Sequence, residues 1–135
     1  MSLLNNAAVG AFVNYNSTLN ANACTVQGNG GEGFRASGSS VLRLQENTIT
    51  QNGSDGVVAL LVSLAYFVGG NTVTDNANSG VRVKDLSMGV FLGEDVTGNQ
   101  GGTDVLCEPQ GPQTRGTADS INGGTTNCVE TGTPG

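Results

Sequence analysis

Residues 47–60 (NTITQNGSDGVVAL) are followed 24 residues later by a near copy, residues 71–84 (NTVTDNANSGVRVK). Each copy contains a short unit that begins with Asn and ends with Gly, and related units occur along most of the chain. They read NAAVG from Asn6, NGGEG from Asn29, NGSDG from Asn52, NANSG from Asn76 and, in a degraded form, NQGGT from Asn99. The spacings of 23, 23, 24 and 23 residues indicate a repeat protein.

Three short strands are predicted in each repeat. An aliphatic residue with mostly polar neighbours lies three positions before each Asn, which is the alternation of a half-buried strand; these residues are Leu3, Val26, Ile49, Val73 and Val96. The second strand follows the Gly, with Ala11/Val13, Phe34/Ala36, Val57/Ala59 and Val81/Val83 inward. The third has Leu19/Ala21, Leu42/Leu44 and Gly89/Phe91 inward; in the 24-residue repeat either Ala65/Phe67 or Tyr66/Val68 points inward.

One repeat cannot bury its own apolar side, so we expect the repeats to stack as rungs about 4.8 Å apart, with like residues in columns. Asn and Gly suit the corners because both accept left-handed backbone, and stacked Asn amides can hydrogen-bond between rungs. This predicted ladder comprises Asn29, Asn52, Asn76 and Asn99 with Gly33, Gly56 and Gly80. The prediction is an all-β parallel solenoid of about five rungs of 23–24 residues. An antiparallel β-sandwich, the alternative, does not explain the constant spacing.

The segments NTITQN–GSDG, NTVTDN–ANSG and EDVTGN–QGGT resemble the repeats of right-handed, single-stranded parallel β-helix proteins, the pectin-lyase-like superfamily, over about residues 3–107. The resemblance implies the fold and favours a secreted or cell-surface location. It does not fix an activity, because that superfamily contains lyases, hydrolases, epimerases, phage tailspikes and adhesins. Its hydrolases carry a His near the active site, and this chain has no His.

Composition narrows the possible partners. The net charge is −6 and Lys84 is the only lysine, which argues against nucleic acid and anionic membranes as partners. The longest apolar run, residues 57–68, is too short to insert across a bilayer, and the N-terminus lacks the basic region of a signal peptide. Because Leu3 already occupies an inward column, we expect a longer protein or a second chain to cover the first rung.

The chain is predicted to divide into β-helix rungs at residues 1–108 and an irregular C-terminal cap and tail at residues 109–135, which contain all three prolines. The three cysteines cannot all pair within one chain. A disulfide between Cys107 and Cys128 would pin the tail to the last rung, and paired cysteines near the C-terminal end of secreted β-helices support it by resemblance. Cys24 is expected to be a buried free thiol.

Several polar residues are candidates for chemistry, although solvated surface charges explain them more simply. By resemblance to β-helix lyases, Arg82, Lys84 and Asp85 are catalytic candidates, whereas Glu32, Asp55 and Asp75 are weak candidates for Ca²⁺; no other cofactor is expected. Glycoside hydrolysis needs two carboxylates across a cleft, and Glu94, Asp95 and Asp104 are candidates by residue type only. Outward threonines at Thr48, Thr50, Thr72 and Thr74 form a possible surface for ordered water, as in ice-binding solenoids.

The third strand carries apolar residues in both alternating sets, so one set must face outward. The predicted oligomer face comprises Met88, Val90, Leu92, Val41 and Phe67, with Tyr66 as the alternative to Phe67. We therefore expect a structural or binding solenoid module that self-associates or is covered by a missing N-terminal part. A carbohydrate-active domain with a polysaccharide substrate is the second hypothesis, and an ice- or surface-binding solenoid is the third.

Overall fold

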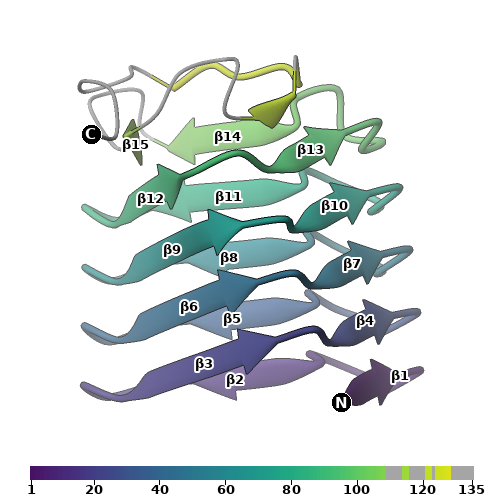
Figure 1. Cartoon of the computed structure of the whole chain (residues 1–135). Helices are drawn as coiled ribbons and strands as arrows, with labels where there is room; N and C mark the ends of the chain where they lie inside the picture. Colours follow the sequence, from purple (N-terminus) through teal and green to yellow (C-terminus); the bar gives the residue numbers. More distant parts are fainter. Residues whose placement is uncertain (109–113, 116–120, 123, 129–135) are drawn as a thin grey trace.

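The computed structural model describes residues 1–108, 114–115, 121–122 and 124–128. Its strands stack along one axis and form three parallel sheets that run along this axis (Figure 1). Sheet 1 contains β1 (Ser2–Leu4), β4 (Thr25–Gln27), β7 (Thr48–Thr50), β10 (Thr72–Thr74) and β13 (Asp95–Thr97). Sheet 2 contains β2 (Ala11–Val13), β5 (Phe34–Ala36), β8 (Val57–Ala59), β11 (Val81–Lys84) and β14 (Val105–Glu108). Sheet 3 contains β3 (Thr18–Asn22), β6 (Val41–Gln45), β9 (Leu64–Gly69), β12 (Met88–Phe91) and β15 (Thr114–Arg115).

Each rung takes one strand from every sheet: β1–β3 form rung 1, and β4–β6, β7–β9, β10–β12 and β13–β15 form rungs 2 to 5 (Figure 1). Every strand pairs in parallel with the same strand of the next rung, so Val26, Ile49 and Val73 lie in one column. The predicted parallel β-solenoid of about five rungs is therefore confirmed.

The inward columns form one continuous apolar core, in which valine, leucine and phenylalanine side chains from all three sheets are fully buried. Ala65 and Phe67 point inward in β9, which settles the phase that the sequence left open, and the Phe67 and Phe91 rings stack with centroids 4.8 Å apart. The extra residue of the 24-residue repeat is absorbed where Leu44 pairs with Phe67 but Gln45 pairs with Gly69. The predicted place of Phe67 on an exposed oligomer face is therefore wrong, because its ring fills the core.

Parallel pairing continues past residue 108, where the sequence analysis placed the end of the rungs. Thr114–Arg115 adds a strand to β12, and Thr126 bridges in parallel to Val105. Ile121 is buried in the same core, so the described part of the C-terminal segment covers the last rung. The remainder of the predicted cap and tail, residues 109–113, 116–120, 123 and 129–135, lies outside the described residues.

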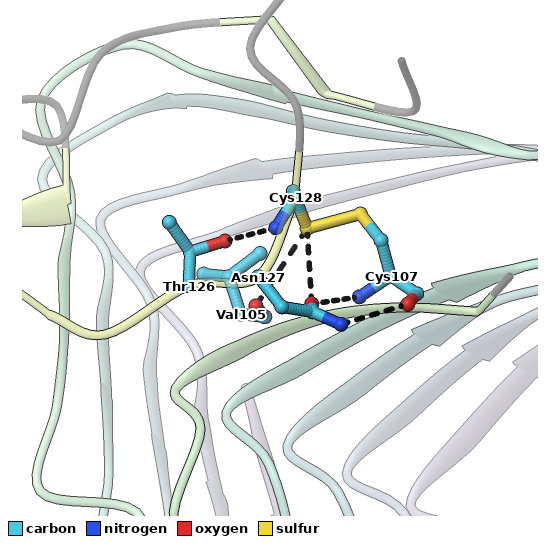
Figure 2. The surroundings of a disulfide bond; sticks show 5 residues. All are labelled: Val105, Cys107, Thr126, Asn127 and Cys128. Carbon is cyan, nitrogen blue, oxygen red and sulfur yellow. Dashed lines mark hydrogen bonds between the residues drawn. A yellow bond between two sulfur atoms is a disulfide. The ribbon is translucent and has the colours of Figure 1, made fainter. Parts of the chain in front are cut away.

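Cys107 and Cys128 form a disulfide that joins β14 to this covering segment, with their Cα atoms 5.1 Å apart (Figure 2). Asn127 reinforces the junction, since its Oδ1 accepts the Cys107 N–H at 2.8 Å and its Nδ2 donates to the Cys107 carbonyl at 3.2 Å. Cys24 is a buried free thiol. Within the described ranges, no helix combines the length and apolar character that a bilayer span requires.

Candidate functional site

An asparagine ladder runs through the corner between sheets 1 and 2. Asn52 shows the pattern: its Nδ2 donates to Asn76 Oδ1 at 2.9 Å and its backbone N–H donates to the same oxygen at 3.1 Å. The same Nδ2 also donates to the Val26 carbonyl one rung below, at 3.2 Å. Asn29 and Asn76 repeat this whole pattern, whereas Asn6 begins the ladder with bonds to Asn29 only and Asn99 donates to Asp104 instead of an asparagine. The hydrogen bonds between successive asparagine side chains therefore all run from donor to acceptor toward the C-terminal end, which gives the ladder a direction.

The glycine column exists because the ladder leaves no room beside it. A Cβ on Gly56 would lie 2.8 Å from Asn76 Nδ2 and 2.7 Å from Val73 Cγ1, and Gly33 and Gly80 have equally close neighbours. In the next rung, Asp104 occupies the place of the glycine, because its carbonyl accepts the Val81 N–H as the Gly80 carbonyl accepts the Val57 N–H. The fifth rung has thus replaced glycine by aspartate.

The Asp104 carboxylate ends the ladder. Its Oδ1 accepts both the N–H and the Nδ2 of Asn99 at 2.9 Å, and its Oδ2 accepts the N–H and hydroxyl of Thr125 at 3.0 and 3.1 Å. Burial acts to raise the pKa of Asp104, but the hydrogen bonds from Thr125 and Asn99 outweigh it, so the pKa lies below its ordinary value of 3.8. An acceptor-only group suits this position because the ladder delivers donors to it.

A second ladder follows the corner between sheets 3 and 1. The Cys24 N–H donates to Asn47 Oδ1 at 2.9 Å, Asn47 Nδ2 donates to Asn71 Oδ1 at 2.9 Å, and Asn71 Nδ2 donates to Glu94 Oε2 at 2.8 Å. This ladder also ends on a carboxylate. Glu94 and Asp104 are therefore structural acceptors rather than a catalytic pair, whereas Asp95 faces outward on β13 and accepts the Thr97 hydroxyl at 2.7 Å.

A serine ladder at the corner between sheets 2 and 3 was missed in the sequence. The backbone N–H of each serine donates to the hydroxyl of the serine one rung above, at 3.3, 3.1 and 2.9 Å. Its members are Ser17, Ser40, Ser63 and Ser87, at spacings of 23, 23 and 24 residues. The spacing was a detectable signal, but serine is too common in turns to stand out without the other columns.

The charged residues of the sheet 2 corner form two ion pairs. Arg82 Nε lies 3.5 Å from Asp55 Oδ2, and Arg35 lies 3.6 Å from Glu32. Asp55 also accepts the Ser79 N–H at 3.0 Å. Burial raises the pKa of Asp55, and the positive charge of Arg82 offsets part of that effect.

The structure brings only part of the predicted catalytic and calcium-binding sets together, because Arg82 and Lys84 share the outward side of β11 and Arg82 contacts Asp55. Arg82 is engaged by Asp55, Lys84 lies further along β11, and the exposed Asp85 lies in the turn that follows. Of the calcium candidates, Glu32 and Asp55 each contact an arginine, while Asp75 is exposed on a different turn. In the part of the chain that the structure describes, no three His, Cys, Asp or Glu residues cluster to hold a metal ion.

The outward columns of sheet 1 are rich in threonine. Thr48 pairs with Thr72, and Thr50 pairs with Thr74, so the four predicted threonines lie in two columns. Thr25 extends the first column by one rung and Thr97 extends the second. Each column thus contains three successive threonines, and Asp95 and Gln27 occupy the fourth positions.

The outward side of sheet 3 is apolar in rungs 3 and 4 and at Val41 in rung 2, whereas Arg43 and Gln45 of rung 2 are polar and exposed; we call the apolar part the sheet-3 face. It comprises the partly exposed residues Val41, Leu64, Tyr66, Val68, Met88, Val90 and Leu92. Rung 1 has the polar residues Thr18, Asn20 and Asn22 in these columns. At the edge of the face, the Arg43 guanidinium lies over the Tyr66 ring, 5.1 Å from its centroid. Tyr66, not Phe67, is thus the aromatic residue of the face.

Comparison with known proteins agrees with this geometry. The family described as right handed beta helix region matches residues 2–90, which is more than half of the chain. No curated protein and no solved structure matches the chain.

Proposed function

We propose, from the premise that this chain belongs to the family of right-handed β-helix regions, that it is a structural module that self-associates through the sheet-3 face. The observation that carries the proposal is the apolar character of that face in rungs 3 and 4, where rung 1 of the same sheet is polar and rung 2 contributes only Val41. Monomeric proteins rarely leave large contiguous apolar patches in water. The occupant that we propose is the same face of a second copy, packed sheet on sheet about 10 Å apart.

The buried polar residues support a structural role. The asparagine and serine ladders and the carboxylates of Asp104 and Glu94 all hold one rung on the next. Asp55 and Glu32, the acidic residues of the sheet 2 corner, are paired with arginines. The Cys107–Cys128 disulfide supports a secreted or cell-surface location, because disulfides persist in oxidising compartments.

Sedimentation equilibrium of the wild-type chain and of Val90→Asp tests the proposal. Val90 faces outward near the middle of the sheet-3 face, so a carboxylate there is tolerated by the free chain but is desolvated in the dimer. We expect a wild-type dimer and a Val90→Asp monomer with an unchanged circular dichroism spectrum. The matched control is Thr74→Asp, which adds the same charge on sheet 1 and leaves the dimer intact. A monomeric wild-type chain would refute the proposal.

Binding of ordered water or another regular surface is a second candidate function, supported by the two threonine columns of sheet 1. Hydroxyls repeat there about every 4.8 Å along the stack and about every 6.7 Å along each strand, on in-register parallel strands. We expect thermal hysteresis that is lost in Thr72→Val and retained in Thr18→Val, which alters an exposed threonine of sheet 3. Equal hysteresis in both variants would exclude sheet 1 as the binding surface.

A further inference from the structure

We infer that the turn between sheets 2 and 3 in rungs 3 and 4 extends the contact between the two copies, an inference that rests on the proposed self-association. The turn contributes Leu61 and Val62 from rung 3 and Leu86 from rung 4, which we call the apolar corner. Figure 1 shows these turns at the left end of the stack, where the chain passes from β8 to β9 and from β11 to β12.

The three side chains of the apolar corner project into solvent. Leu61 is 52% exposed, Val62 is 60% exposed and Leu86 is 82% exposed, although the inward columns on either side are fully buried. Rung 2 makes the same turn with Gly38 and Ser39. Small or polar residues therefore satisfy the turn, and the fold itself does not require leucine or valine at these positions.

The backbone of the apolar corner is also unfavourable for these residues. Leu61 has φ 53°, Val62 has φ 62° and Leu86 has φ 61°, which are left-handed values. Two successive left-handed residues are typical of Asn-Gly turns, and a β-branched residue such as valine is an outlier there. Both the exposure and the backbone conformation thus oppose Leu61 and Val62 in an isolated chain, which indicates a role outside it.

The apolar corner is continuous with the sheet-3 face. The Val62 N–H donates to the Asp85 carbonyl at 2.9 Å, which places Val62 beside Leu86 on the next rung. The serine ladder then holds Ser63 to Ser87 at 2.9 Å, and the next residues along the chain, Leu64 and Met88, begin the face. One apolar surface therefore runs from the corner to the far end of β9 and β12.

The area of this surface favours a second copy as its occupant. A standard interface buries about 800 Å² on each partner, of which roughly 450 Å² is apolar. We estimate the exposed apolar area from the area that an aliphatic side chain removes from water when it is buried. On this basis the seven partly exposed residues of the sheet-3 face supply on the order of 200 Å². The three residues of the apolar corner supply about 200 Å² more. The corner therefore roughly doubles the apolar area that the sheet-3 face offers to a second copy and brings the total close to that of a standard interface.

Two-fold symmetry strengthens this argument, because each contact of an isologous dimer occurs twice. The corner lies at the margin of the sheet-3 face, so when two faces pack together each corner reaches the surface of the other copy. Leu61, Val62 and Leu86 would then be removed from water in both copies, and the burial of their apolar surface would stabilise the dimer.

The double variant Leu61→Asn/Val62→Gly tests the inference, because Asn-Gly is the pair that this turn favours. We expect the dimer dissociation constant, measured by sedimentation equilibrium, to rise by about tenfold or more. Urea unfolding at a protein concentration below the dissociation constant measures the stability of the monomer. We expect the monomer of the double variant to be more stable than the wild-type monomer, because the strain of the left-handed backbone is relieved. A residue pair that served only the fold would not give these opposite responses.

The matched control is Tyr15→Asn, which replaces a residue that is 81% exposed with φ 54° at the same turn in rung 1. It should stabilise the monomer in the same direction and leave the dissociation constant unchanged. A double variant that dimerises like the wild type, while Val90→Asp is monomeric, would overturn the role of the corner and leave the proposed function standing. A wild-type chain that is monomeric would overturn both and would assign the surface to another occupant.

Discussion

Removal of one link from the middle of the first asparagine ladder should destabilise the protein severely. Asn52 Oδ1 accepts the N–H of Asn29 at 3.2 Å and its Nδ2 at 2.9 Å, while Asn52 Nδ2 donates to Asn76 and Val26. In Asn52→Ala these four hydrogen bonds are lost. The buried Asn29 N–H then has no acceptor, whereas Asn29 Nδ2 retains the Leu3 carbonyl at 3.0 Å.

The magnitude follows from the groups that lose partners. A buried N–H without an acceptor costs about 1–3 kcal/mol, and each of the other three hydrogen bonds contributes about 0.5–1 kcal/mol. We therefore expect Asn52→Ala to lower the free energy of unfolding by about 3–5 kcal/mol, which is a large part of the 5–15 kcal/mol that is typical of a folded domain. Urea unfolding followed by circular dichroism measures the change.

Two further variants separate the hydrogen bonds from the loss of side-chain volume. Asn6→Ala removes an exposed end of the same ladder and loses only the bond from Nδ2 to Asn29, so it should cost less than about 1 kcal/mol. Asn52→Asp keeps the size and the acceptor but turns a carboxylate oxygen toward the Val26 carbonyl, so it should be as harmful as alanine at neutral pH. Equal effects of Asn52→Ala and Asn6→Ala would refute the proposed role of the ladder.

Three other predictions follow from the ladder ends, the glycine column and the disulfide. Asp104→Asn should lower the free energy of unfolding by about 1–3 kcal/mol at pH 7, because an amide group would face the Thr125 donors. Since the pKa of Asp104 is lowered, the stability that its carboxylate contributes is present above pH 3.8 and is lost as the pH falls below that value. Urea titrations at several pH values should therefore show the difference in stability between wild type and Asp104→Asn vanish at low pH. Gly56→Ala should lower the thermal midpoint, with a cost of about 1–3 kcal/mol from the contacts of the new Cβ, whereas Gly31→Ala, where the nearest atom lies at 3.3 Å, should have a smaller effect. Reduction of the disulfide between Cys107 and Cys128 should cost about 3 kcal/mol in the loop-entropy model, and equal midpoints with and without dithiothreitol would contradict this.

The spacing of the Asn and Gly residues was sufficient to predict the rungs, because stacking imposes the same requirement on every turn of the chain. The inward columns at Val26, Ile49 and Val73 followed from simple alternation, and the structure places them one above another. Alternation failed where both sets were apolar. In β9, Phe67 and Tyr66 are equally plausible inward residues by sequence, and only the stacking of Phe67 on Phe91 distinguishes them.

The role of Asp104 was hidden because the fifth repeat departs from the pattern. Its unit reads NQGGT, so the glycine of the column is missing from its expected place and Asp104 lies one residue beyond it. A carboxylate is favourable there because the last rung has no further asparagine above it to accept the hydrogen bonds from Asn99. A repeat pattern does not show this requirement, because it arises only at the end of the ladder. Residue type alone suggested a catalytic acid, and the hydrogen bonds from Asn99 and Thr125 reveal a structural one.

The direction of the ladders separates the positions that serve the fold from those that are free to serve function. Each ladder delivers donors toward the C-terminal end, so it must finish on an acceptor, and both the Asp104 and the Glu94 carboxylates meet that need. The corners are therefore constrained along the stack, and the amides and carboxylates of the two ladders are already engaged. The outward columns carry no such constraint, and they differ between sheets: threonine on sheet 1, charged pairs at sheet 2 and apolar residues on sheet 3. The stacking of the rungs does not explain why faces built from the same repeat differ from one another. We therefore look for binding sites on these outward faces.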